Sequence, residues 1–220
     1  MKIIAKIYTD FKEKFGIPRQ SGLLSASRGK IVFEKEYRNP DALRGLEDFS
    51  HLWIIWKFSE AQLEQWRPTV RPPRLGGNKK VGVFATRSPF RPNPIALSSV
   101  RIEEIKNESE GTVIYVSGVD MLDGTPIYDI KPYVAYSDSH PDARSGFAEE
   151  RFGKKLEVAD PQSELEKLPE EMRETLISLL EEDPRPQYQN DPMREYGMKY
   201  AEHELFFKVS DGTLTVTKVK

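Results

Sequence analysis

The chain has 220 residues, 33 of them basic and 35 acidic, and a formal net charge of −2. It contains no cysteine, which excludes disulfides and thiolate metal sites, and its three histidines are too widely spaced to predict a metal site, although carboxylates could still hold Mg²⁺. The chain contains no uninterrupted run of 18 apolar residues, which a membrane-spanning helix would need, and its first residues lack a signal-peptide core. We therefore expect a cytoplasmic protein with no membrane partner.

The first 140 residues predict short strands separated by turns rich in glycine and proline. The candidate strands are residues 2–8, 31–37, 50–58, 81–86, 95–105 and 112–120. Residues 52–58 (LWIIWKF) are almost continuously apolar, which is typical of a central strand or a barrel stave. A short helix is expected to start at Asn39-Pro40-Asp41 and to run to about Leu46. Several short strands at this spacing indicate an all-β barrel or sandwich.

The composition changes at residues 137–146 (SDSHPDARSG), which we expect to be a linker or a mobile loop. A short helix is predicted over residues 161–167, with Ser163 and Glu166 at the spacing of a capping box. A second helix is predicted over residues 169–182. Its apolar face carries Met172, Leu176, Leu179 and Leu180.

The last predicted elements are two segments, 196–209 and 213–219, that flank Asp211-Gly212, which is a strong hairpin signal. The fold class we predict is therefore mainly β. It consists of an antiparallel β-barrel over residues 1–140 and a small α+β domain over residues 141–220.

The segment 81–95 (VGVFATRSPFRPNPI) is the most informative stretch of the chain. Regular structure is opposed there by three prolines, Pro89, Pro92 and Pro94, which also push the residues before them to extended geometry. Arg87 and Arg91 lie four residues apart in this segment, and guanidinium groups suit carboxylates or phosphates. We interpret the segment as a stiff loop that presents two cations to an anionic ligand.

The charge around this loop is strongly one-sided. No acidic residue occurs from Gln65 to Ile102. The same window holds eight cations, Arg67, Arg71, Arg74, Lys79, Lys80, Arg87, Arg91 and Arg101. Such asymmetry indicates an anionic partner, with nucleic acid first, and the alternative is a solvated basic loop.

Six blocks in order give the chain a family resemblance. They are KEKFGIPRQSGL (12–23), LEDFSHLWIIWKF (46–58), WRPTVRPPRLGGN (66–78), FATRSPFRPNP (84–94), VDMLDGTPIYDIKPY (119–133) and DPRPQY (183–188). Together they resemble the TrmO (YaeB/TsaA-like) family. The resemblance implies an S-adenosylmethionine-dependent methyltransferase acting on N6-threonylcarbamoyladenosine in tRNA, not on DNA. It also implies a homodimer in which both protomers contribute ligand loops.

The cofactor site cannot be of the Rossmann type, because no two glycines are separated by a single residue. The resemblance implies instead a site built on the barrel. It assigns cofactor binding to Pro18, Arg19, Gln20, Phe58, Ser59, Arg87, Leu97, Leu122, Asp123, Gly124 and Thr125. Either Arg87 or Arg19 could clamp the carboxylate of the methionine tail, and Phe58 could stack on adenine, although it could also be ordinary core.

The acceptor side has several candidates. Asp183, Arg185 and Tyr188 of DPRPQY are assigned as catalytic, with Asp183, Tyr188 or Asp129 as a possible base and Arg185 as a binder of the substrate carboxylate or a phosphate. RNA contacts are assigned to Arg67, Arg71, Arg74 and Arg91, with Trp66 as a stacking aromatic beside them.

Two other readings remain open at this point. One is a non-catalytic RNA- or nucleotide-binding module, which would explain the basic window and the β fold. The other is a Mg²⁺-dependent nucleotide hydrolase using Asp123, Asp129 and Asp183, which requires those carboxylates to converge.

Overall fold

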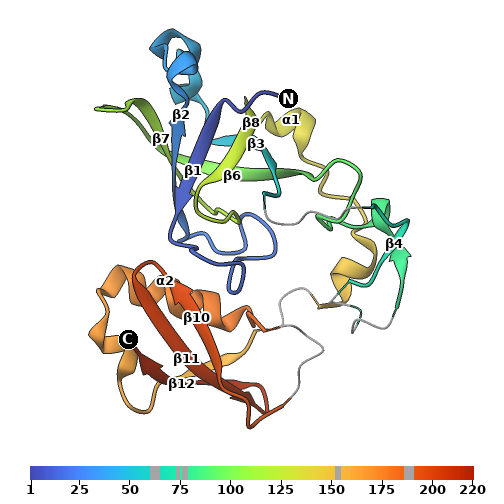
Figure 1. Cartoon of the computed structure of the whole chain (residues 1–220), viewed down its shortest axis with the longest axis vertical. Helices are drawn as coiled ribbons and strands as arrows, with labels where there is room; N and C mark the ends of the chain where they lie inside the picture. Colours follow the sequence, from blue (N-terminus) through green and yellow to red (C-terminus); the bar gives the residue numbers. More distant parts are fainter. Residues whose placement is uncertain (60–64, 73–74, 76–78, 152–154, 186–190) are drawn as a thin grey trace.

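The computed structural model describes residues 1–59, 65–72, 75, 79–151, 155–185 and 191–220. Figure 1 shows a β-barrel in the upper half of the molecule and a smaller sheet with helix α2 in the lower half. The short β4–β5 pair (Thr69–Val70 and Val81–Gly82) lies to one side.

The barrel is closed by antiparallel strands in the order β1-β2-β7-β6-β3-β8. The strands are β1 (Ala5–Thr9), β2 (Arg28–Phe33), β3 (His51–Lys57), β6 (Ile95–Glu108), β7 (Gly111–Ser117) and β8 (Thr125–Pro132). Alternate side chains along them point inward, as the pleat of a strand requires, and Ile7, Ile54 and Ile114 are fully buried. The predicted β-barrel is confirmed.

Some predicted strand positions in this half are wrong. Strand β8 was missed, because its polar and proline residues give it no clean alternation. Residues 83–85 form a 3₁₀ turn instead of continuing a strand, with Val83 buried and the Thr86 hydroxyl donating to the Val83 carbonyl. The second strand also begins and ends earlier than predicted, at Arg28–Phe33, and is followed by a 3₁₀ turn at Lys35–Tyr37.

The short connecting elements differ in detail from the predictions as well. The helix expected from Asn39-Pro40-Asp41 to about Leu46 is two 3₁₀ turns, Pro40–Leu43 and Leu46–Asp48, separated by Gly45 in the left-handed region. The expected linker begins inside the short helix α1 (Ala135–Asp138), whose Asp138 carboxylate accepts from the Trp53 indole and the Val134 amide. Another 3₁₀ segment covers Gly146–Arg151.

The C-terminal half is a four-stranded sheet of order β10-β11-β12-β9, covered by α2 (Glu170–Glu181). Its strands are β9 (Glu157–Ala159), β10 (Tyr196–Tyr200), β11 (His203–Ser210) and β12 (Thr213–Val219). The hairpin predicted at Asp211-Gly212 is confirmed: both residues have positive φ, and Ser210 pairs with Thr213. The segment 196–209 holds two strands, β10 and β11, because the chain turns at Ala201, whose φ is +49°.

The predicted capping box is also wrong. Ser163 has a φ of +52° and makes no capping hydrogen bond to the 3₁₀ turn Glu164–Lys167. Asp160 caps this turn instead, because its carboxylate accepts from the amides of Glu164 (2.9 Å) and Leu165 (2.8 Å).

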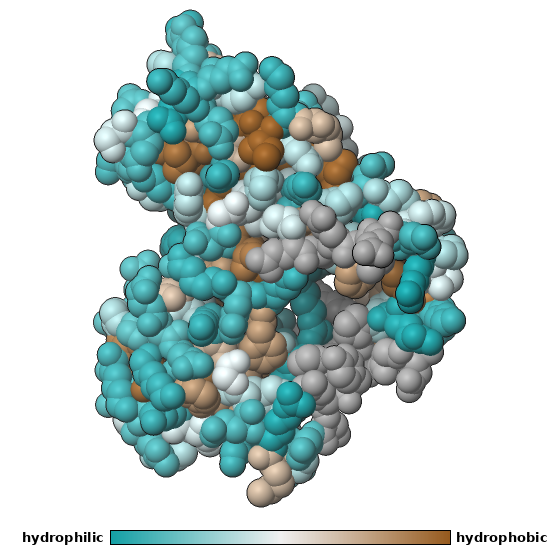
Figure 2. All heavy atoms as spheres, in the orientation of Figure 1, coloured by the Kyte–Doolittle hydropathy of each residue, from teal (hydrophilic) through white to brown (hydrophobic). Residues whose placement is uncertain are grey.

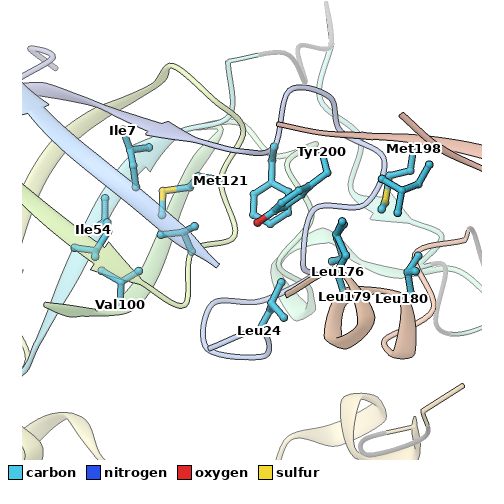
Figure 3. Packing of buried hydrophobic residues seen from close by; sticks show 14 of the residues in the cluster. Ile7, Leu24, Ile54, Val100, Met121, Leu176, Leu179, Leu180, Met198 and Tyr200 are labelled. Atoms are coloured by element: carbon cyan, nitrogen blue, oxygen red, sulfur yellow. The ribbon is translucent and has the colours of Figure 1, made fainter. Parts of the chain in front are cut away.

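The two halves share one continuous core. Figure 3 shows barrel residues such as Ile54 and Met121, and residues of the C-terminal half such as Leu176 and Met198, with Leu24 and Tyr200 between them. The Phe11 ring meets the Tyr200 ring edge-on at 5.5 Å. The loop after β1 is therefore clamped between the barrel and the second sheet, and this fixes the start of the site described next.

Candidate functional site

A cavity of about 1340 Å³ opens beside the barrel. Its walls come from the loop after β1, strands β3 and β6, the segments 67–72 and 86–93, and the turn before β8. One residue of the later part of the chain, Phe147, also lines it. The molecular surface in this view is mostly hydrophilic, with hydrophobic residues confined to separate patches (Figure 2). A cavity this large exceeds the usual size of a site for one small molecule.

Nine of the eleven residues predicted to bind the cofactor line this cavity. They are Pro18, Arg19, Gln20, Phe58, Ser59, Arg87, Leu97, Leu122 and Thr125. They come from five separate stretches of the sequence, and the closure of the barrel brings them together. Phe58 also packs on Trp56 with ring centroids 4.5 Å apart, so it combines a core contact with a surface facing the cavity.

The other two predicted cofactor residues, Asp123 and Gly124, do not line the cavity. The Asp123 carboxylate accepts from the Thr9 amide at 2.9 Å and pairs with the Lys12 ammonium at 3.0 Å. Gly124 has a φ of +73° with open space where a Cβ would stand. A glycine suits this left-handed turn, because a residue with a Cβ would be strained there.

The loop that carries Arg87 and Arg91 is braced from within. One Arg91 terminal nitrogen donates to the Thr86 carbonyl at 3.0 Å, and the guanidinium lies over the Phe84 ring at 6.0 Å. The Arg87 guanidinium donates to the side-chain oxygen of Gln20, in the loop after β1. Arg87 is therefore held at the cavity lining, where its remaining donors can meet a ligand carboxylate.

Three of the four arginines assigned to RNA also line the cavity, namely Arg67, Arg71 and Arg91, while Arg74 lies outside the described residues. Close to them Trp66 is 51% exposed and stacks on Phe84, which is 71% exposed, with ring centroids 6.2 Å apart. Exposed aromatic rings beside cations are the combination that single-stranded nucleic acid prefers.

Arg19 connects the cavity to the C-terminal half. One of its terminal nitrogens donates to the carbonyls of Asp183 (3.3 Å) and Arg185 (3.1 Å). The Asp183 carboxylate in turn accepts from Arg185 Nε (2.9 Å) and from a terminal nitrogen of the same guanidinium (3.0 Å). Neither Asp183 nor Arg185 lines the cavity, and Tyr188 lies outside the described residues.

The sequence reasoning did not single out Asp120, which lines the cavity. Its carboxylate accepts from the Ser98 hydroxyl at 2.7 Å, and that hydroxyl accepts from the Trp56 indole at 2.9 Å. Burial raises the pKa of Asp120 from 3.8 to about 6, against the opposing effects of hydrogen bonds from Ser98 and from backbone amides and of the Arg87 charge. The available signal was an acid at the end of the apolar strand predicted at 112–120, in the same block as Asp123.

Replacing Asp120 by asparagine is expected to stabilise the fold at pH 7.5, by up to about 3 kcal/mol from a pKa displaced by about two units. Because the folded pKa lies above the unfolded one, the ionised carboxylate weakens the fold above pH 6. This penalty fades as the pH falls from about 6 to about 4. Urea unfolding of both proteins across this range measures the difference, and Asp142→Asn, which changes an exposed acid, is the control. A variant less stable than the parent at pH 7.5 would contradict this account.

The lining residues fit S-adenosylmethionine in chemistry as well as in volume. Arg87 suits the carboxylate of its amino-acid tail, and the Trp56 and Phe58 rings offer apolar contact for adenine. The cavity volume leaves room for an acceptor nucleoside beside it.

Comparison with known proteins agrees with this site. The model of the tRNA-methyltransferase O N-terminal domain matches residues 6–139, and the TrmO C-terminal domain matches residues 151–220. The tRNA (adenine(37)-N6)-methyltransferase of Escherichia coli is 42% identical over 204 residues, covering 90% of this chain and 86% of that protein.

A second enzyme of the same name, from Eikenella corrodens, is 44% identical and covers 78% of this chain and 97% of its own length. The crystal structure of TrmO from Pseudomonas aeruginosa superposes with a TM-score of 0.77 at 32% identity, over 99% of this chain and 97% of that one. With both family domains matched along its length, this chain belongs to the tRNA-methyltransferase O (TrmO) family.

Proposed function

We propose that this protein is an S-adenosylmethionine-dependent tRNA methyltransferase that methylates N6 of N6-threonylcarbamoyladenosine at position 37, next to the anticodon. The observation that carries this proposal is the match of both family domains to a chain whose barrel holds a large, basic, aromatic-lined cavity. Relatives from several organisms carry the name tRNA (adenine(37)-N6)-methyltransferase or S-adenosylmethionine-dependent methyltransferase.

In this proposal the barrel residues bind the cofactor, which supplies an electrophilic methyl group when bound. Arg87, held by Gln20, binds the methionine carboxylate, and Phe58 and Ser59 bound the nucleoside part. Pro18 and Leu97 give shape to the walls, as does the turn of Leu122 and Thr125. Asp123 and Gly124 belong to the same turn and stabilise its conformation. The Asp123 carboxylate does so by accepting hydrogen bonds from the Thr9 amide and the Lys12 ammonium.

The acceptor RNA approaches over the arginines on the cavity wall. Arg67, Arg71 and Arg91 provide positive charge for phosphates, together with Arg74, and Trp66 and Phe84 provide stacking surfaces. We propose that Asp183, Arg185 and Tyr188 serve the acceptor side. The bidentate Asp183–Arg185 pair fixes the backbone of this segment, which Arg19 joins to the cavity.

The hydrolase alternative finds no support in the positions of its carboxylates. Asp123 pairs with Lys12, Asp129 pairs with Lys131 at 3.2 Å, and Asp183 pairs with Arg185. Within the described part of the chain, no three acidic or histidine side chains are placed to share a metal ion.

We also propose a cytoplasmic homodimer. Phe90 and Leu97 line the cavity yet are 42% and 54% exposed, so one wall is apolar and open. A second copy that covered this wall would enclose the ligand. Among the described residues, no helix is long and apolar enough to span a membrane.

Methyl transfer from labelled S-adenosylmethionine to tRNA carrying N6-threonylcarbamoyladenosine tests the function. We expect label in the tRNA and a nucleoside heavier by one methylene, identified by mass analysis of digested RNA. Transcript tRNA that lacks the modification is the matched control and should stay unlabelled. Binding of cofactor and tRNA without transfer would support the non-catalytic binding module instead.

The dimer makes a separate prediction. Sedimentation at the assay concentration is expected to show twice the chain mass of 25.3 kDa. Phe90→Glu, which places a charge on the open wall itself, is expected to shift the equilibrium toward monomer and to lower activity together with it. A fully active monomer would refute the dimer requirement.

A further inference from the structure

The described residues lining the cavity include seven cations but a single acid. The cations are Lys14, Arg19, Arg67, Arg71, Lys80, Arg87 and Arg91, and the acid is Asp120. The other carboxylates considered for proton transfer are engaged elsewhere: Asp183 with Arg185, and Asp129 with Lys131. Asp120 is therefore the one carboxylate among the described lining residues that could accept a proton inside this cavity.

Asp120 is held in a fixed orientation. Ser98 on β6 donates to its Oδ1 atom at 2.7 Å, and the Ser98 hydroxyl is oriented by the Trp56 indole of β3 at 2.9 Å. The amide of Ser21, in the loop after β1, also donates to the carboxylate, and Arg87 is the charged group that acts on it. Three elements thus position a partly buried carboxylate that still reaches the cavity surface.

The proposed reaction needs such a group. The N6 nitrogen of the acceptor carries one hydrogen and is part of a urea, so its lone pair is delocalised and it is a weak nucleophile. If the nitrogen were methylated while it still carried this hydrogen, the product would be a cationic and strongly acidic nitrogen. The proton must therefore leave during or after methyl transfer. An ionised carboxylate in a poorly solvated site is an effective acceptor at neutral pH.

We propose that Asp120 is the proton acceptor of methyl transfer. It is oriented for this role by the Ser98 hydroxyl, which the Trp56 indole in turn orients. This inference rests on the proposed function. As the carbon–nitrogen bond forms, the carbon–sulfur bond breaks and its electron pair stays on sulfur, giving a neutral thioether. The N6 proton passes to the Asp120 carboxylate, which then releases it to water. The arrangement also explains why a fold would keep a destabilising buried acid.

The experiment compares Asp120→Asn with the parent and with Asp142→Asn. Calorimetry measures affinity for S-adenosylmethionine, and single-turnover kinetics at saturating cofactor measure transfer to modified tRNA from pH 5 to 8. For Asp120→Asn we expect affinity within about threefold of the parent and a rate lower by about 10²–10⁴-fold. The parent's rate should fall tenfold per pH unit below about pH 6, and the variant should lose this dependence.

A second variant tests the hydrogen bond from Ser98 to Asp120 without removing the acid. Ser98→Ala deletes the hydroxyl that stabilises the ionised carboxylate, so the acid limb of the pH profile should move to higher pH while the plateau rate is largely kept. Carbon NMR of the Asp120 carboxyl should show the same upward shift of its pKa, independently of activity.

The outcomes separate the two proposals. An active parent with an equally active Asp120→Asn variant overturns the role of Asp120 alone. A more than tenfold loss of cofactor affinity with an unchanged saturated rate also overturns it, and would make Asp120 a partner of the cofactor's ammonium group. A parent that binds cofactor but never methylates the modified tRNA overturns the proposed function as well.

Discussion

Replacing Arg87 by alanine is expected to weaken binding of S-adenosylmethionine by about 1.5–3 kcal/mol, which is roughly ten- to more than a hundredfold in affinity. The guanidinium is hydrogen-bonded to Gln20 and is held by a loop that Arg91 braces. The guanidinium is therefore already oriented when a ligand carboxylate arrives, so the Arg87 side chain loses little conformational entropy on binding. Calorimetry on the purified variant measures the loss.

Two further variants make this result specific. Arg87→Lys should recover only part of the affinity, because an ammonium keeps the charge but not the two-pronged geometry. Arg101→Ala removes an exposed cation on β6 that does not line the cavity, and should bind as the parent does. A folded Arg87→Ala protein with unchanged affinity would move the carboxylate site elsewhere, with Arg19 as the next candidate.

Arg185→Ala is expected to lower the free energy of unfolding by about 2–4 kcal/mol. Only 8% of Arg185 is exposed, and its removal leaves the Asp183 carboxylate without its bidentate partner. The Asp183 side chain keeps 26% exposure, so water offsets part of the loss, and the effect should fall below that of a fully buried pair. Urea unfolding provides the measurement.

Arg194→Ala is the matched control, because Arg194 also lies over the Tyr196 ring, at 5.2 Å against 6.0 Å for Arg185, but is exposed. It should change stability by less than about 0.5 kcal/mol. If both variants were equally stable, the Asp183–Arg185 pair would add nothing to the fold. Its place in DPRPQY would then have to be explained by contact with the acceptor alone.

The fold could be predicted from the sequence where local chemistry decides it. The turn Asp211-Gly212 and the apolar stripe of α2 are such cases. Strand β8 could not be predicted, because its pairing with β1 and β3 depends on barrel closure and not on its own pattern. The capping of Glu164–Lys167 was misassigned because Ser163 takes a left-handed conformation that no spacing rule reveals.

The site likewise has features that local sequence reveals and features that depend on tertiary structure. The family blocks identify most residues that line the cavity, since those residues lie inside contiguous motifs. Asp120 lies within one of these blocks, but its importance depends on Ser98 and Trp56, which are 22 and 64 positions away. Two acids of one motif, Asp120 and Asp123, differ only in what surrounds them, and that depends on the tertiary structure.

The position of Arg19 has a consequence for how the two ligands influence each other. Its guanidinium belongs to the cavity wall and also holds the carbonyls of Asp183 and Arg185. Under the proposed function, a cofactor that bound this guanidinium in the cavity would change those two hydrogen bonds, so occupancy of the cavity would be energetically coupled to the segment proposed to serve the acceptor. Thermodynamic reciprocity then requires the cofactor to change tRNA affinity by the same factor by which tRNA changes cofactor affinity.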